Sequence, residues 1–501
     1  MSDTASSTKP AADAPAGPGR FFAKFMVLRG AMPELWLVFA IKLLVIAAYS
    51  ITNSTLVLWF SSDLGYSDEK ALALVGAWSV LMTLFTVLVG SLTDAIGMRR
   101  TFFWGVGICI FARAVMSFTT VKWIALAGGL FPLGIGEALT GPVLVAAARV
   151  YSNTKQRSIS FSMIYIMMNV GFTVANLVFD FVRKGLGEHG HMTLPLLGLK
   201  LTTYQTLFLA SLVIQCINLP LIYFLREGAE ATDDGVKITP KTDKHRHENL
   251  WNGFRLTLRD TVKDTVRLFR ELLGQDGFYR LLAFLVLIAF LKLIFKQMDY
   301  VFPKFGIRVL GDGAPIGRLL AINTILIIPL VFIIGALTQR FSAYSMVIVG
   351  GVISSASVFL LALPTVWFEP LTHTGAARWV GHWYLGLDGP IHPYYVMIAL
   401  FVVMLSFGEA FYSPRVYEYA AAIAPKGQEA SYSALSYVPF LLAKMLTAAF
   451  SGMLMARYCP EQGVRRPEIM WLFVALTGSV APIGLFTLGR FIRLKEAGRE
   501  D

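Results

Sequence analysis

Hydrophobic segments that are nearly free of charged residues follow one another along most of the chain. They lack the two-residue alternation of a half-buried strand, and each is close to the roughly 20 residues that a helix needs to cross a bilayer. Segments of this length also exclude a membrane β-barrel. The pattern predicts twelve transmembrane helices at residues 35–60, 71–93, 101–121, 123–148, 159–182, 203–225, 278–300, 318–338, 343–363, 393–414, 431–455 and 468–490.

Composition agrees with this interpretation. Of the 501 residues, 55% are hydrophobic and only 15% are charged, and the mean hydropathy is +0.61. A soluble domain would carry about 25% charged residues. The three cysteines form no CxxC pair, so neither a disulfide framework nor a metal site is expected. The fold class that follows is an all-α membrane protein.

The net charge of +12 is unevenly distributed between the loops. Loops on the side that carries both termini hold about twice as many Lys and Arg as loops on the opposite side, which is typical of the cytoplasmic face. We therefore expect a multi-pass protein of the cell inner membrane with both termini in the cytoplasm. The charge is a topology signal, and no nucleic acid partner is expected.

A long polar loop divides the twelve segments into two groups of six. Within it, residues 249–273 place apolar side chains at helical spacing between basic ones, so this segment is predicted to lie on anionic lipid. Packing on the cytoplasmic ends of the two groups is the alternative. The expected organisation is a tail at 1–33, a six-helix bundle at 34–225, a linker at 226–277, a second six-helix bundle at 278–490 and a tail at 491–501.

The two groups are related in sequence. Residues 136–142, GEALTGP, recur 272 residues later as residues 408–414, GEAFYSP, and the register continues into the next segment. Residues 90–93, GSLT, likewise match residues 335–338, GALT. Parallel repeats of six helices place a solute site between the halves near the bilayer midplane.

Ionisable residues inside the predicted helices are functional candidates, because a charge in the bilayer core is costly unless it is paired or hydrated. Glu137 and Glu409 occupy repeat-related positions, where they line a cavity or form ion pairs with Arg113 or Lys444. Of the remaining candidates, Lys292 and Lys296 share a helix face, where they bind a carboxylate or, for Lys296, extend to the outer interface. The other candidates are Lys42 and the repeat-related Tyr165 and Tyr437.

The loop after the second helix carries a recognisable pattern. Residues 90–100 read GSLTDAIGMRR, in which glycines permit close helix contact and a tight turn, and the acid can meet a helix start or a basic residue. This loop resembles the signature G-x-L-x-D-x-x-G-x-R-[RK] of the major facilitator superfamily, over a region covering residues 34–490. In that family the loop latches the cytoplasmic side of the outward-open state. The residues that would form the latch are Gly90, Asp94, Gly97, Arg99 and Arg100.

The tenth helix is similar to that of the proton-coupled oligopeptide transporters, through Gly408-Glu409, Ser413-Pro414 and Ala424-Pro425. In that family the acid faces the cavity and helps to hold the amino end of a peptide. The chain departs from the family in two respects, since the E-x-x-E-R motif of the first helix and the two additional central helices are absent. Its first helix offers Lys42, Tyr49, Asn53 and Trp59 instead.

These observations predict a monomeric secondary transporter that moves a small polar solute, carboxylate-bearing or zwitterionic, together with protons. It would need no cofactor besides a proton gradient. Glu409 is expected to contact substrate or proton, and Glu137 to anchor two helices through Arg113. An efflux antiporter on the same fold and a membrane sensor without transport are the alternatives. Enzyme motifs such as HExxH and GxSxG are absent from the sequence.

Overall fold

The computed structural model describes residues 26–194, 198–233, 235–238, 276–338, 341–422 and 438–493, with isolated positions between 256 and 274. The predicted lipid-binding segment at 249–273 therefore lies largely outside the described residues. So do the two tails, apart from the residues that border the first and last helices.

The first half of the chain forms six long helices. Three of them begin at side-chain caps: Ser67 at α3, and the capping boxes Asn153–Gln156 at α7 and Thr202–Gln205 at α8. After a 3-10 turn η1 (Met26–Gly30), the elements are α2 (Pro33–Ser62), α3 (Asp68–Ile96), α4 (Met98–Phe118), α5 (Lys122–Ile124) continuing through the π-turn η2 (Ala125–Leu130) into α6 (Phe131–Val150), α7 (Thr154–Leu186) and α8 (Thr203–Tyr223). Two short antiparallel hairpins join β1 (His191–Leu194) to β2 (Leu199–Thr202), and β3 (Ala229–Thr232) to β4 (Gly235–Ile238).

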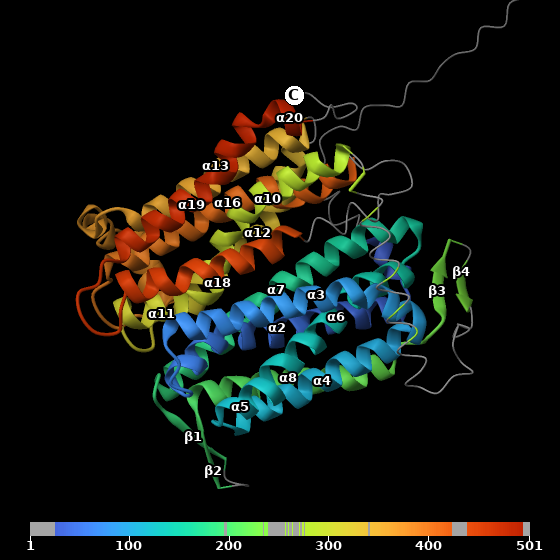
Figure 1. Ribbon diagram of the computed structural model, residues 1–501, viewed down its shortest axis with the longest axis horizontal. Helices are drawn as coiled ribbons and strands as arrows, with labels where there is room; N and C mark the ends of the chain where they lie inside the picture. The colour runs from blue at the N-terminus through green and yellow to red at the C-terminus, as the bar shows by residue number, and fades with distance from the viewer. Residues whose placement is uncertain are drawn as a thin grey trace, which may run out of the picture.

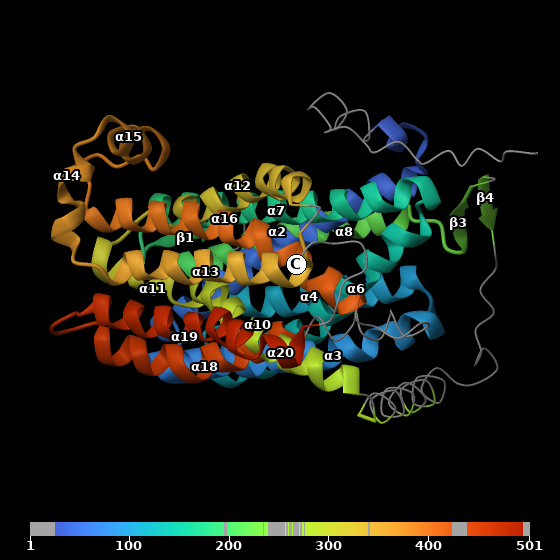
Figure 2. The ribbon, with the colours of Figure 1, turned by 90° about the horizontal axis from the view of Figure 1, so that it is seen from above.

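The second half repeats this plan. Its long helices are α10 (Asp276–Tyr300), α12 (Ile316–Leu337), α13 (Ala343–Ala362), α16 (Pro393–Ala422), α18 (Val438–Tyr458) and α19 (Pro467–Thr487). Short turns connect or end them: α11 (Phe302–Phe305), η3 (Gly306–Leu310), η4 (Thr365–Phe368), α14 (Glu369–Thr372), α15 (Gly375–Arg378), η5 (Trp379–Tyr384) and α20 (Gly489–Ile492). Figure 2 shows α14 and α15 projecting sideways at one end of the bundle.

The long helices confirm the predicted membrane spans to within a few residues at most ends. Within the described part of the chain, eleven of them are long and apolar enough to cross a membrane. The twelfth, α18, has 21 residues and packs against α3 and α10. The fold is that of a twelve-helix membrane protein with two six-helix bundles.

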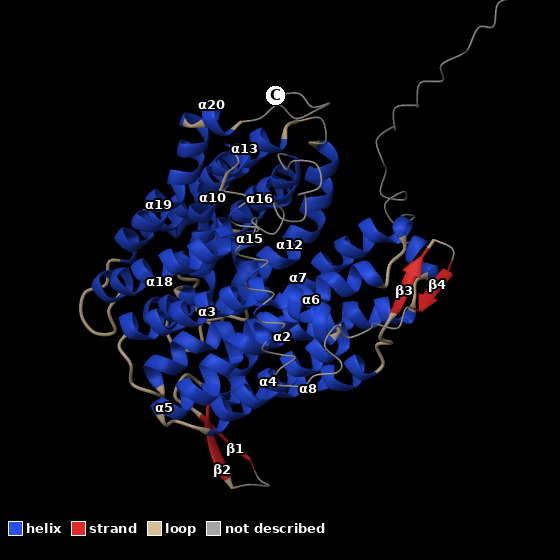
Figure 3. Cartoon of the chain, turned by 45° about the vertical axis from the view of Figure 1, so that its right-hand side comes forward, coloured by secondary structure: helices blue, strands red, loops and turns tan. Residues whose placement is uncertain are grey.

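The two bundles meet along two seams, one between α3 and α18 and the other between α7 and α12. Figures 1 and 3 show the bundles close together at the end that carries β1 and β2, and diverging toward the end that carries β3 and β4. We call these the β1–β2 end and the β3–β4 end. The molecule is therefore closed at one end and splayed at the other.

The internal repeat is visible in how the helices cross. In the first half α4 and α6 approach so closely that a Cβ added at Gly136 would lie 2.7 Å from Cys109 Sγ and 2.8 Å from the carbonyl oxygen of Gly105. In the second half a Cβ at Gly408 would collide with Ser354 and lie 2.8 Å from the carbonyl oxygen of Gly350. Small residues let helix backbones approach in this way. The equivalent glycines therefore place the two acidic residues at equivalent points of the two bundles.

Candidate functional site

In the first half, Glu137 is paired with a buried arginine. Arg113 on α4 donates from Nη2 to Glu137 Oε1 at 2.5 Å, and both side chains are buried. Its Nε donates to Thr52 Oγ1 of α2 at 3.1 Å, and Thr52 in turn donates to Ser211 of α8. The predicted contact between Arg113 and Glu137 is present, within a polar cluster that joins four helices.

In the second half, Glu409 has a different environment. The 245-residue offset between Gly105 and Gly350 places Val358 where Arg113 stands in the first half, and Val358 is fully buried. Instead of an arginine, Glu409 Oε2 accepts a hydrogen bond at 3.1 Å from Asn323 Nδ2 on α12. Asn323 also donates to Ser406 Oγ at 3.0 Å. Repeat-related acids thus occupy matching positions with unlike partners.

Lys292 lies close to Glu409 on the facing helix α10. Its Nζ donates to Ser413 Oγ at 3.2 Å and stands 4.8 Å from the centre of the Tyr412 ring, a cation–π distance. The charges of Lys292 and Glu409 are near enough to interact, but no ion pair within 4 Å joins them among the described residues.

One turn along α10, Lys296 forms an ion pair of 2.7 Å with Asp299. Lys444 and, from the other half, Tyr49 lie near enough to interact with these charges. Lys296 therefore points among the helices rather than out to the membrane interface. Next to the pair, Tyr300 OH lies 3.0 Å from Ser79 Oγ of α3, a hydrogen bond between the halves.

The remaining candidates are placed as follows. Lys42 is buried in α2, and no hydrogen bond or ion pair to it is found among the described residues. Tyr165 packs against the cluster of Ile327, Ile334 and Ala410 of the other half, at the α7–α12 seam. Tyr437 lies outside the described residues.

The loop predicted to be a latch turns sharply between α3 and α4. Gly97 has φ +92°, and a Cβ there would collide with the Glu227 side chain, so glycine is required. The Arg99 guanidinium lies 5.0 Å from the centre of the Tyr223 ring. Arg100 is exposed. The Asp94 side chain lies outside the described part, as does the burial of Gly90, so the role of this carboxylate stays a prediction.

Charged groups also join the halves at the β1–β2 end. Asp68 at the start of α3 forms ion pairs with Lys304 and, at 2.6 Å, with Arg308. Arg308 also donates a hydrogen bond of 2.8 Å from Nη1 to the carbonyl oxygen of Cys459, the residue after α18. This cluster closes the α3–α18 seam at that end.

Sequence reasoning missed several polar residues that shape the site. Asn323 belongs to an apolar helix, where an amide among aliphatic residues was the available signal. Asp180, near the end of the fifth apolar segment, is buried between the two halves. Its position depends on how the bundles meet, which hydrophobicity along one segment does not indicate.

Comparison with known proteins places this architecture among membrane transporters. The family model of the Major Facilitator Superfamily matches residues 38–381. No curated protein sequence matches the chain significantly.

Solved structures with the same fold include peptide transporters. A structure described for substrate recognition in proton-dependent oligopeptide transporters has a TM-score of 0.66 and 17% identity, over 92% of this chain and 98% of that one. A POT family transporter in complex with 5-aminolevulinic acid has a TM-score of 0.65 and 15% identity, over 92% and 96%. A mutant peptide transporter POT in complex with alafosfalin has 0.64 and 16%, over 91% and 94%. At these identities the likeness concerns the fold.

Proposed function

The chain belongs to the Major Facilitator Superfamily and is a transporter rather than an enzyme, and we propose that it moves a small solute bearing a carboxylate, zwitterionic or peptide-like, together with protons. The excess of Lys and Arg in the loops on the side of the two termini supports a location in the cell inner membrane with the termini in the cytoplasm. With that orientation, the closed β1–β2 end faces outward and the splayed end faces the cytoplasm.

The observation that carries the proposal is the unlike pairing of the two repeat-related acids. Glu137 is paired with Arg113 at 2.5 Å, so a cation is already in contact with its carboxylate. Within the described part of the chain, Glu409 accepts a hydrogen bond from the Asn323 amide, and the charge of Lys292 interacts with it without forming an ion pair. A carboxylate whose cation partner is not in contact can change its proton occupancy when that cation or a solute approaches. Glu409 is thus the residue suited to link protonation to conformation.

The charges around Glu409 also support the class of solute. Lys292 and Lys296 supply positive charge, while Glu409 and Asp299 supply negative charge on the same helices or facing ones. A solute with one carboxylate and one amino group finds a partner of opposite sign for each. 5-Aminolevulinic acid, the ligand named for one structural relative, carries one amino group and one carboxylate.

Alternating access supplies the mechanism. A site between two repeats is exposed to one side at a time when the bundles rock about it. The structure corresponds to one such state, with interhalf contacts gathered toward the β1–β2 end and the bundles apart at the β3–β4 end. Release of these contacts, with approach of the opposite ends, would give the other state.

The proposal is tested in proteoliposomes with a pH gradient imposed across the membrane. The solute would first be chosen by thermal-shift screening against peptides, amino acids and organic acids, because a bound solute stabilises the folded state by mass action. Glu409→Gln should abolish gradient-driven uptake while labelled solute still exchanges in counterflow. A Glu409→Gln protein that keeps full gradient-driven uptake would refute the role given to this acid. Lack of any counterflow in the wild-type protein would refute transport of that solute.

A further inference from the structure

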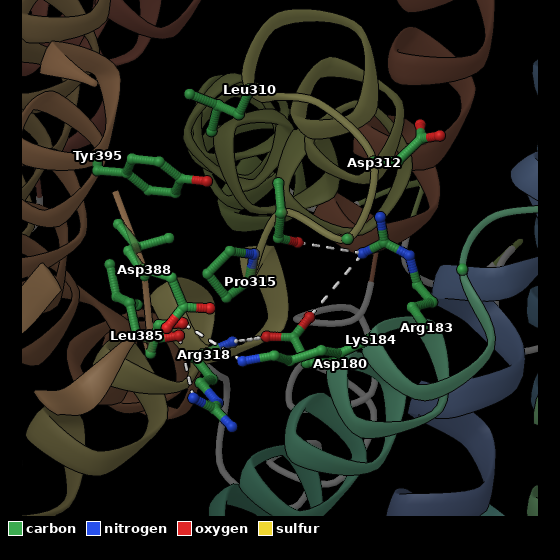
Figure 4. Close-up of a pocket in the computed structure, with 15 residues that line it drawn as sticks. Asp180, Arg183, Lys184, Leu310, Asp312, Pro315, Arg318, Leu385, Asp388 and Tyr395 are labelled. Atoms are coloured by element: carbon green, nitrogen blue, oxygen red, sulfur yellow. Dashed lines mark hydrogen bonds and ion pairs between the residues drawn. The ribbon is translucent and has the colours of Figure 1, made fainter. Parts of the chain in front are cut away.

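Asp180, near the end of α7, bonds to the backbone of the opposite half. Its Oδ1 accepts from the amide of Gly317 at 2.9 Å, and its Oδ2 accepts from the amide of Arg318 at 2.7 Å. Both amides belong to the first turn of α12, whose N–H groups have no partner within the helix. Figure 4 shows the carboxylate facing this helix start across the seam. A side chain of the first bundle therefore caps a 22-residue helix of the second.

Neighbouring groups make the seam tight around this cap. Arg183, one turn after Asp180, donates to the carbonyl oxygen of Ala314 at 3.4 Å and also pairs with Glu188. A Cβ added at Gly317 would collide with the carbonyl oxygen of Asn176 and lie 2.8 Å from Asp180 Oδ1. The cap thus exists only while the α7–α12 seam is closed, and it must break when the β1–β2 end opens.

Water can reach this carboxylate from the β1–β2 end. Asp180 borders a cavity of about 330 Å³, and exposed side chains, including Lys184, Asp312 and Asp388, line the same cavity. Figure 4 shows the cavity between α7, α12 and the loop before α16. The charged and titratable groups that surround Asp180 are Arg183 and Lys184 of α7, Asp312 and Arg318 at and before α12, and Tyr384, Asp388 and Tyr395 of the loop and α16.

We propose that Asp180 is a proton-operated latch that holds the β1–β2 end closed while its carboxylate is ionised. An ionised carboxylate at a helix N-terminus accepts charge-assisted hydrogen bonds. It is also attracted to the positive end of the helix dipole. A proton bound to one oxygen turns that oxygen into a donor facing an N–H group and removes the charge. Protons arriving from the β1–β2 side therefore loosen the seam on that side.

This inference rests on the proposed proton-coupled transport, which it deepens by naming a second proton-binding carboxylate. Glu409 would bind the proton that is transported with the solute. Protonation of Asp180 would instead open the β1–β2 end so that solute can enter. The latch predicted around Asp94 is a separate device, because the loop after α3 follows the end of that helix opposite to Asp68 and the β1–β2 cluster.

The test measures the opening of the β1–β2 end directly and needs no solute. Spin labels at Lys200 of β2 and Glu369 of α14, in a protein whose three cysteines are replaced, would report the distance between the halves in lipid nanodiscs. In the otherwise unaltered protein, a longer distance should appear as the pH falls from about 8 to about 5, a range in which a carboxylate as buried as Asp180 can take up a proton although an exposed aspartate stays ionised. In Asp180→Asn the longer distance should predominate at both pH values.

The expected effect is a rise of about 10-fold to 100-fold in the ratio of open to closed populations for Asp180→Asn at the higher pH, as for loss of hydrogen bonds to a charged group. Asp388→Asn, at an exposed acid of the same cavity, is the matched control and should behave as the unaltered protein. If Asp180→Asn does not fold, Gly317→Ala should open the end at both pH values without removing a titratable group.

The inference is overturned if the distance in the labelled parent protein does not respond to pH, or if Asp180→Asn keeps the parent's response. It is overturned equally if Gly317→Ala leaves the end closed. These outcomes are independent of the proposed function, because gradient-driven uptake that depends on Glu409 could persist without a latch at Asp180. Conversely, a pH-dependent opening would support the latch even if the solute class proved wrong.

Discussion

Replacing Glu137 by Gln should destabilise the folded protein strongly, because it leaves the Arg113 guanidinium without its counter-charge. Arg113 is completely buried, and its Nη1 has no hydrogen-bond partner among the described residues. Its Nε would still donate to Thr52 Oγ1 at 3.1 Å, a neutral partner. Removal of one member of a buried ion pair costs about 3–5 kcal/mol, since the other charge stays desolvated.

Two comparison variants isolate the cause of this loss. Glu409→Gln, at the repeat-related position, breaks no ion pair and should cost about 1 kcal/mol, the typical value of one hydrogen bond. A double variant, Arg113→Val with Glu137→Leu, removes both charges and should recover most of the stability, because apolar residues often replace a buried ion pair without net loss. The fully buried Val358 shows that the second bundle already packs a valine at the equivalent place.

The measurement is thermal unfolding in detergent, followed by the fluorescence of the ten tryptophans at one fixed scan rate, since unfolding of such a protein is under kinetic control. The expected order of apparent Tm places Glu137→Gln well below the double variant, with Glu409→Gln close to the parent protein. Equal apparent Tm values for Glu137→Gln and Glu409→Gln would refute the reasoning. A double variant no more stable than Glu137→Gln would show that the unpaired arginine is not the cause.

Three further predictions concern the latch loop, the topology and the solute. Asp94→Asn should slow uptake at unchanged apparent Tm, because its contacts are expected in one access state only, and unaltered uptake rates would show that the motif has no role here. A cysteine at position 240 should react with impermeant reagents only from the cytoplasmic side, and reaction from outside would overturn the orientation. Lys292→Gln should raise the KM of a carboxylate solute about 10-fold or more, as for loss of a hydrogen bond to a charged group. The KM of the methyl ester of the same solute should not change in Lys292→Gln. Equal KM changes for the acid and its ester would rule out a lysine–carboxylate contact.

Hydrophobicity was sufficient to locate the helices because each one must satisfy its own backbone groups within the membrane. The predicted helix ends were less accurate where a cap or packing against the other half, rather than the edge of the membrane, sets the end of the helix. The fifth segment, expected at 159–182, extends as α7 from Thr154 to Leu186. It starts at the Asn153 cap, and its end carries charges that are buried against the other half rather than placed in water. Interhalf packing thus lengthens a helix beyond its apolar run.

Pairings inside one bundle were predictable from the sequence, whereas pairings between bundles were not. Arg113 and Glu137 are opposite charges in consecutive helices, so their contact follows from a need to neutralise both. The contact between Asp180 and the start of α12 is made to backbone N–H groups, and the cation that pairs with Asp180, Arg183 at 3.9 Å, lies on its own helix. Asn323 likewise acts through its amide. Charge matching along the sequence detects neither of them.

The asymmetry of the two halves can be tested by restoring the missing arginine. Val358→Arg would place a guanidinium opposite Glu409 as Arg113 stands opposite Glu137, because the glycine crossings at Gly136 and Gly408 fix equivalent geometry. The new pair would hold the carboxylate ionised, so gradient-driven uptake should be lost in a protein that still folds. Val358→Met, similar in length but neutral, should retain uptake and controls for the added bulk. If Val358→Arg folds and still takes up solute along the proton gradient, then Glu409 does not bind the coupled proton, and the unlike pairing of the two repeats has another cause.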